Sequence, residues 1–116
     1  MYLLLQRVWD ECDLVLTPVT LGPAPSLAQF CRADNRQQTA VQDFCTQPAN
    51  LAGVPALSLP ARLTRSDPAL PLAVQLMAPR GEDEELLRAG AWLENQLVFP
   101  RLAVDWDRLE QEAGPD

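Results

Sequence analysis

Residues 42–60 constrain the fold more than any other part of this sequence. Their first half is predicted to be a helix that ends near residues 50–53, where small side chains let two backbones approach closely. Pro55 then closes a turn, and residues 56–59 are a short apolar run that is typical of a buried strand. Because Pro60 has no N–H to donate to a neighbouring strand, we expect the strand to end or bulge there.

Before this stretch, the pattern predicts a helix, a strand and a loop. Residues 1–11 carry apolar side chains at helical spacing. Residues 13–18 are a branched apolar run that ends in proline, which is typical of a buried strand. Residues 21–33 contain glycine and several prolines, so we expect an irregular surface loop. A second helix is then expected to begin with Asp34 or Asn35 as its N-cap residue.

After it, the pattern predicts a hairpin and a long helix. A turn cluster at residues 65–68 separates the 56–61 strand from a second strand over residues 72–77. Residues 81–97 are predicted to be a helix whose first turn is acidic, where the helix dipole favours negative charge, and Pro100 ends it. The side chains expected to be buried on this helix are Leu86, Ala89, Leu93 and Leu97.

The composition excludes most catalytic chemistries. The sequence has no histidine and no lysine, because all nine basic residues are arginines, so it contains neither a Ser-His-Asp triad nor a lysine base. The net charge of −7 argues against a nucleic-acid surface. No apolar run is long enough to cross a membrane. The cysteines are widely spaced and predicted to be reduced, and the consecutive acidic residues 82–85 do not share a helix face, so no metal site is predicted.

Twelve residues within the 42–60 stretch carry a resemblance to a known family. They are Phe44, Thr46, Pro48, Asn50, Leu51, Ala52, Gly53, Pro55, Ala56, Ser58, Leu59 and Pro60. In these residues the sequence resembles the C-terminal part of the amidase signature family. Within that family it is most similar to the A-subunit branch of the glutamyl-tRNA(Gln) amidotransferases, including its mitochondrial members.

The resemblance implies an α/β fold, the C-terminal part of an amidase domain with a mixed central sheet flanked by helices. Here the piece is expected to run helix, strand, helix, hairpin, helix over residues 1–104, with a C-terminal tail at residues 105–116. The family hydrolyses amides with a serine nucleophile, a bridging serine and a lysine base. The serines Ser26, Ser58 and Ser66 stand alone here and lysine is absent, so the chain is expected to be a fragment without catalytic residues, inactive in isolation.

The resemblance also implies one substrate-binding residue. In the amidotransferase branch, an aspartate at the position of Asp43 is implied to bind the α-ammonium group of glutamine. A carboxylate beside an apolar helix face is costly unless it is paired, and a ligand ammonium can be that partner. From spacing alone, the alternative is a solvated residue or a salt bridge with Arg32 or Arg36. Thr46 and Asn50 are predicted to bond locally, to the preceding turn and the helix end.

The implied function lies in translation. The A subunit would hydrolyse glutamine and supply ammonia for converting Glu-tRNA(Gln) to Gln-tRNA(Gln), with ATP and magnesium bound by the partner subunit rather than by this chain. Subunits B and C are the implied partners, tRNA is expected only through the complex, and no membrane contact is expected. The expected location is the mitochondrial matrix, or alternatively a bacterial cytoplasm. Two other functions stay open: a fragment of another amidase signature hydrolase, and a truncated, non-catalytic interaction module.

Overall fold

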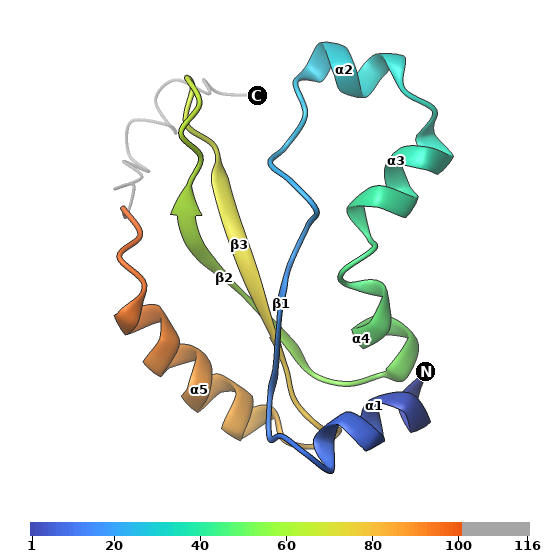
Figure 1. Cartoon of the computed structure of the whole chain (residues 1–116), viewed down its shortest axis with the longest axis vertical. Helices are drawn as coiled ribbons and strands as arrows, with labels where there is room; N and C mark the ends of the chain where they lie inside the picture. Colours follow the sequence, from blue (N-terminus) through green and yellow to red (C-terminus); the bar gives the residue numbers. More distant parts are fainter. Residues whose placement is uncertain (101–116) are drawn as a thin grey trace, which may run out of the picture.

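A computed structural model describes residues 1–100 except for the side chain of Asn35, and in it helices and strands are combined as the predicted α/β class requires (Figure 1). The elements are α1 (Tyr2–Trp9), β1 (Val15–Pro18), α2 (Leu27–Arg32), α3 (Asn35–Gln42), α4 (Gln47–Ala52), β2 (Ala56–Leu63), β3 (Pro71–Met77) and α5 (Asp83–Gln96). The predicted tail at residues 105–116, and the end of the predicted 1–104 piece, lie outside the described residues.

The sheet is built around β3. Its three strands are in the order β1-β3-β2, and both neighbours run antiparallel to β3, so Met77 pairs with Val15 on one side and with Ala56 on the other. The predicted hairpin is therefore confirmed. The register of β2 shifts between Pro60 and Arg62, which confirms the bulge predicted at the proline.

Helix α5 packs on the hairpin and forms the core with it (Figure 1). The buried cluster consists of Leu59, Leu76, Ala78 and Leu86, and Ala89, Leu93 and Leu97 pack against it. All four residues of the predicted apolar stripe thus face the core. Asp83 and Glu84 lie in the first helical turn as predicted, and Gly90 lies so close to Leu57 that an added methyl group would overlap it.

Strand β1 is more exposed than the sequence predicted. Its residues alternate between half-buried and exposed, and the side chain of Leu16 is 57% exposed. The predicted strand and its end at Pro18 are confirmed, but the predicted burial is wrong. The physical reason is position, because β1 is an edge strand of the sheet that the structure describes.

The predicted loop at residues 21–33 contains a helix, α2. A capping box starts it: the backbone N–H of Gln29 donates to Ser26 Oγ at 3.3 Å, and the backbone N–H of Ser26 donates to Gln29 Oε1 at 3.0 Å. The loop was predicted from the prolines of this segment. All of them precede Ser26, so they do not interrupt the helix that the capping box starts.

The predicted single helix before Gly53 is two helices, α3 and α4, with a turn at residues 43–46. Pro48 lies in the first turn of α4. In one continuous helix, its ring would clash with the carbonyl of Phe44 and its missing N–H would leave that carbonyl without a partner. The predicted start and end are confirmed, because Asp34 caps α3 and Gly53 ends α4 with a φ of 64°.

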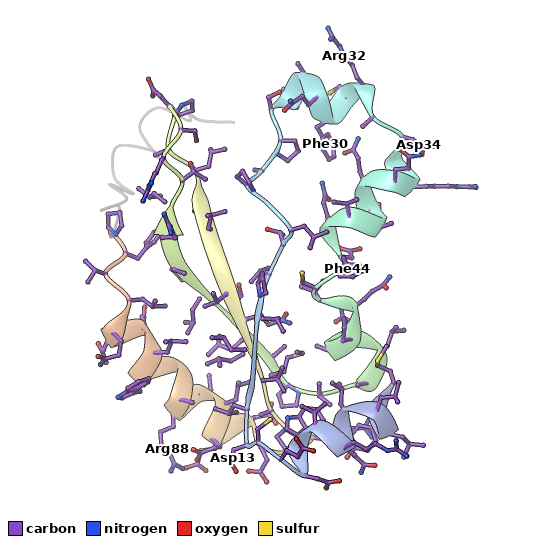
Figure 2. All side chains as sticks on the ribbon, viewed as in Figure 1. Asp13, Phe30, Arg32, Asp34, Phe44 and Arg88 are labelled. Carbon is purple, nitrogen blue, oxygen red and sulfur yellow. The ribbon has the colours of Figure 1, made fainter. Side chains whose placement is uncertain are left out.

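The break also changes which side chains are covered. The sequence placed Asp43 beside an apolar helix face, yet Val41 and Phe44, the large apolar residues next to Asp43, are 55% and 64% exposed. Phe30 and Phe44 both lie in the helical segment (Figure 2), and neither belongs to the core between α5 and the hairpin. The segment from α2 to α4 therefore lacks the apolar packing that joins α5 to the hairpin.

Candidate substrate-recognition site

Asp43 occupies the C-terminal end of α3, where its backbone is held on both sides. Its N–H donates to the Thr39 carbonyl at 2.9 Å, and its own carbonyl accepts from the N–H groups of Thr46 at 3.1 Å and Gln47 at 2.8 Å. The hydroxyl of Thr46 donates to the same carbonyl at 3.2 Å, which confirms the local role predicted for Thr46. The turn thus fixes the direction in which the chain leaves α3.

The carboxylate of Asp43 is exposed. In the described part of the chain it forms no hydrogen bond or ion pair. Of the two alternatives from spacing, the salt bridge with Arg32 or Arg36 is therefore absent there, and the exposure fits the other, a solvated residue. The C-terminal end of a helix carries partial negative charge, and no basic residue lies in the last turn of α3. Helix end and carboxylate therefore both favour a cation at this point.

Asp43 lies on the wall of a cavity of about 900 Å³. The cavity is bounded by the segment that follows β1 and by α2 and α3, and most of its lining is apolar, including Leu21, Phe30 and Val41. Thr46 joins Asp43 in the lining. An open cavity with a mostly apolar lining that includes an aspartate suits a small ligand that carries an ammonium group.

Gln38 holds two walls of this cavity together. Its side-chain amide donates to the carbonyls of Phe30 at 2.6 Å and Ala33 at 3.0 Å, which links α3 to the end of α2. Its Oε1 atom is buried and has no hydrogen-bond partner in the described part of the chain. Gln38 therefore helps to shape the cavity. Its amide nitrogen already donates to two backbone carbonyls of the protein.

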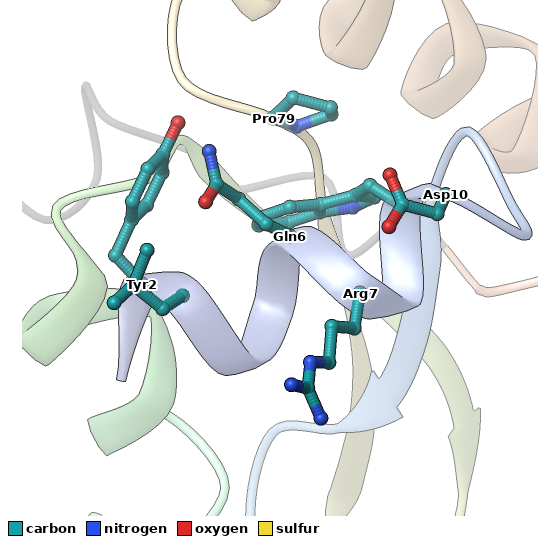
Figure 3. A pocket seen from close by; sticks show the side chains of 7 residues that line it. Tyr2, Gln6, Arg7, Asp10 and Pro79 are labelled. Carbon is teal, nitrogen blue, oxygen red and sulfur yellow. The ribbon is translucent and has the colours of Figure 1, made fainter.

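A second cavity of about 620 Å³ lies beside α1. Tyr2, Gln6 and Asp10 extend along one side of the helix toward Pro79, while Arg7 extends from the opposite side (Figure 3). No residue predicted to bind substrate lines this cavity. We assign it no part in the site at Asp43.

Gln75 is a residue whose role the sequence analysis missed. It lies in the middle strand β3, is 4% exposed, and its amide nitrogen donates to Thr17 Oγ1 at 3.5 Å and to the carbonyl of Cys45 at 3.3 Å. Cys45 belongs to the turn that follows Asp43. A polar residue within an otherwise apolar strand was the available signal.

Arg80 is the second missed residue. Its guanidinium donates to the Gly53 carbonyl at 3.0 Å and to the Ala52 carbonyl at 2.5 Å, and it lies over the Tyr2 ring, 4.5 Å from the centroid. These bonds close the C-terminal end of α4. Asn50 was predicted to do so, but within residues 1–100 its side chain forms no hydrogen bond, and that prediction was wrong.

The remaining candidate groups serve structure. Ser26 caps α2, the Ser66 hydroxyl bonds within the hairpin loop to Thr64 Oγ1 at 2.6 Å, and Ser58 is exposed on β2. Residues 82–85 start α5, and Arg88 pairs with Glu84 and Glu85. In the part of the chain that the structure describes, no cluster of three His, Cys, Asp or Glu residues could hold a metal ion. No described helix has the length and apolarity needed to span a membrane.

Comparison with known proteins places this geometry in context. A model of the amidase family matches residues 4–87. Proteins named as the mitochondrial A subunit of glutamyl-tRNA(Gln) amidotransferase are 50% identical in Aedes aegypti, over 80% of this chain, and 50% identical in Drosophila pseudoobscura pseudoobscura, over 89%. The human protein of that name is 40% identical over 76% of this chain. The matches cover 18%, 19% and 16% of these relatives, so the chain spans less than a fifth of their length.

Proposed function

Because this chain belongs to the amidase family, we propose that it is part of the glutamine-hydrolysing A subunit of a mitochondrial glutamyl-tRNA(Gln) amidotransferase. The observation that carries the proposal is the Asp43 carboxylate, which is unpaired within residues 1–100 and lies on the wall of a cavity of about 900 Å³. The shared name of the relatives, at 40% to 50% identity, supports the amidotransferase branch.

In this proposal, Asp43 binds the α-ammonium group of glutamine. A carboxylate and an ammonium group form a charge-assisted hydrogen bond, and the negative end of α3 adds to the attraction. The apolar side chains that line the cavity would contact the methylene groups of the substrate. The role of this chain is recognition, because it contributes no lysine and no paired serines to the hydrolysis of the amide.

The rest of the reaction belongs to parts of the protein outside this chain and to its partners. A serine nucleophile and a lysine base elsewhere in the longer protein would release ammonia from glutamine. Subunits B and C would be the partners, and the B subunit would use the ammonia with ATP and magnesium to convert Glu-tRNA(Gln) to Gln-tRNA(Gln). The names of the relatives support a location in mitochondria.

The test is Asp43→Asn in the full-length protein assembled with its partners. Hydrogen bonds to charged groups contribute about 1.5–3 kcal/mol, so we expect KM for glutamine to rise roughly 10- to 150-fold. Free ammonia bypasses the glutamine site, so the ammonia-dependent reaction should keep its rate. An amide substrate without the α-amino group should be affected less than twofold, because it has no ammonium group to lose.

Asp10→Asn is the matched control, because Asp10 is likewise an exposed aspartate at the C-terminal end of an eight-residue helix. It should leave all three reactions unchanged. Equal losses with glutamine, ammonia and the des-amino amide in Asp43→Asn would make Asp43 a structural residue. Hydrolysis of other amides without any use of glutamine would favour a different amidase. Amide hydrolysis by the isolated 116-residue chain would contradict the assignment of the catalytic residues to the rest of the protein.

A further inference from the structure

We propose that Gln75 is a positioning residue for the recognition site: its side-chain amide holds the turn that carries Asp43 against the centre of the sheet. The predicted effect on the turn stands on the structure alone. The predicted effect on glutamine rests on the proposed function.

The burial of Gln75 is the first argument. At 4% exposure it is the one polar residue buried among the residues that the structure describes. Burying an amide costs free energy unless its groups are hydrogen-bonded, so a glutamine inside an apolar strand needs specific partners. Its amide nitrogen finds the Cys45 carbonyl at 3.3 Å and Thr17 Oγ1 at 3.5 Å. The shorter of these two contacts is with Cys45, which belongs to the turn after Asp43.

The bonding within the turn is the second argument. The Asp43 carbonyl accepts three hydrogen bonds, all of them from Thr46 and Gln47, and these fix the shape of the turn but not its place on the sheet. In residues 1–100, the bond from Gln75 to the Cys45 carbonyl is the one hydrogen bond that joins the sheet to residues 43–47. The place of the turn therefore depends on this amide.

The weak packing around the turn is the third argument. Val41 and Phe44, which flank Asp43, are 55% and 64% exposed. On the α3 side of the turn, apolar contacts therefore do little to hold the segment in place, whereas on the α4 side Cys45 is half-buried and Ala49 is buried. Cys45 follows Asp43 by two residues, so a shift of its carbonyl moves the carboxylate with it.

Hydrogen exchange of the full-length protein tests the effect on the turn. Gln75→Met keeps the length of the side chain and removes its donor. A neutral hydrogen bond contributes about 0.5–1.5 kcal/mol, so the amides of residues 43–47 should exchange about 2- to 12-fold faster. The amides of α5 should change less than twofold. Thr17→Val is the matched control: it removes the 3.5 Å contact and keeps the bond to Cys45, so it should leave residues 43–47 protected.

Kinetics of the assembled complex test the effect on the substrate. We expect Gln75→Met to raise KM for glutamine about 3- to 10-fold with kcat within twofold, because positioning acts on binding. The ammonia-dependent reaction and the des-amino amide should be unaffected. In an Asp43→Asn background, Gln75→Met should add less than twofold, because the two residues then act through one lost interaction.

The outcomes separate this inference from the proposed function. Unchanged exchange at residues 43–47 overturns the inference, whatever the kinetics show. Faster exchange there, with glutamine, ammonia and the des-amino amide equally impaired, also overturns it and leaves Gln75 a structural residue. A null effect of Asp43→Asn overturns the proposed function, while the exchange data still decide the place of the turn. If Gln75→Met is insoluble, Gln75→Leu makes the same change in the donor and carries the same expectations.

Discussion

Two regions of this chain are held together by different forces. The hairpin unit, formed by β2, β3 and α5, has a buried apolar cluster that includes Leu59, Leu76 and Leu86. The helical arm, residues 26–53, contains only Ala49 and Ala52 as buried residues within the described part. Apart from contacts between α4, which carries these two alanines, and α1, it is joined to the rest by side-chain hydrogen bonds, chiefly from Gln75 and Arg80.

This difference in packing shows that the proposed recognition residue lies on the less stable of the two regions. Each hydrogen bond contributes about 1 kcal/mol, whereas a buried leucine contributes several times more, so the arm opens at lower free energy than the hairpin unit. Asp43 lies on the arm, and the hairpin unit supplies the strand to which the arm is attached. A rigid unit thus carries a less stable segment that holds the binding residue, as is common for sites on loops.

The largest effect that tests this comparison should come from the core. Leu86→Ala removes a side chain that is 3% exposed, and such changes cost about 2–5 kcal/mol of unfolding free energy. Native-state hydrogen exchange in the full-length protein should show this loss at the amides of β3 and α5. Leu87→Ala is the control, because Leu87 is 60% exposed and its loss should change stability by less than about 0.5 kcal/mol. Equal effects of the two would mean that α5 does not stabilise the hairpin as its packing indicates.

A smaller effect is expected where the arm is attached. Arg80→Met removes both bonds to the end of α4 and the contact with the Tyr2 ring. Because Arg80 is exposed, we expect a loss of about 1–2 kcal/mol, seen as faster exchange at the amides of Gly53 and Val54 but not in α5. Arg65→Met, at an exposed arginine of the hairpin loop, should leave these amides unchanged. A loss spread equally over α5 would erase the distinction between the two regions.

The same comparison explains what the sequence could predict. The hairpin unit was predicted almost completely, because its buried leucines recur at strand and helix spacing and Pro60 marks the bulge. The fold class followed, and Asp43 was proposed from the family resemblance. In the arm, few side chains are buried, so hydrophobic periodicity in the sequence carried little information about its helices.

The errors in the arm have local causes. The helix α2 was missed although the Ser26–Gln29 capping box is visible in the sequence, and the break before α4 was missed although Pro48 requires one. The roles of Gln75 and Arg80 could not be predicted in the same way. Each bonds to a carbonyl 27 to 30 residues away in the sequence, and only the folded chain brings such groups together.

The smallest expected effect separates recognition from stability at Asp43 itself. A carboxylate at the C-terminal end of α3 faces the negative end of the helix dipole, which disfavours it by about 0.3–1 kcal/mol. Asp43→Asn should therefore leave the arm as stable as before or stabilise it by up to about 1 kcal/mol, measured by exchange at the α3 amides. Asp10→Asn should give at most the same small gain in α1, because Asp10 has the same place at the end of its helix but Arg7 lies in the last turn there. Only Asp43→Asn should also weaken glutamine binding. A clear loss of stability in Asp43→Asn would show that the carboxylate supports the turn, and the weaker binding would then be a consequence of unfolding.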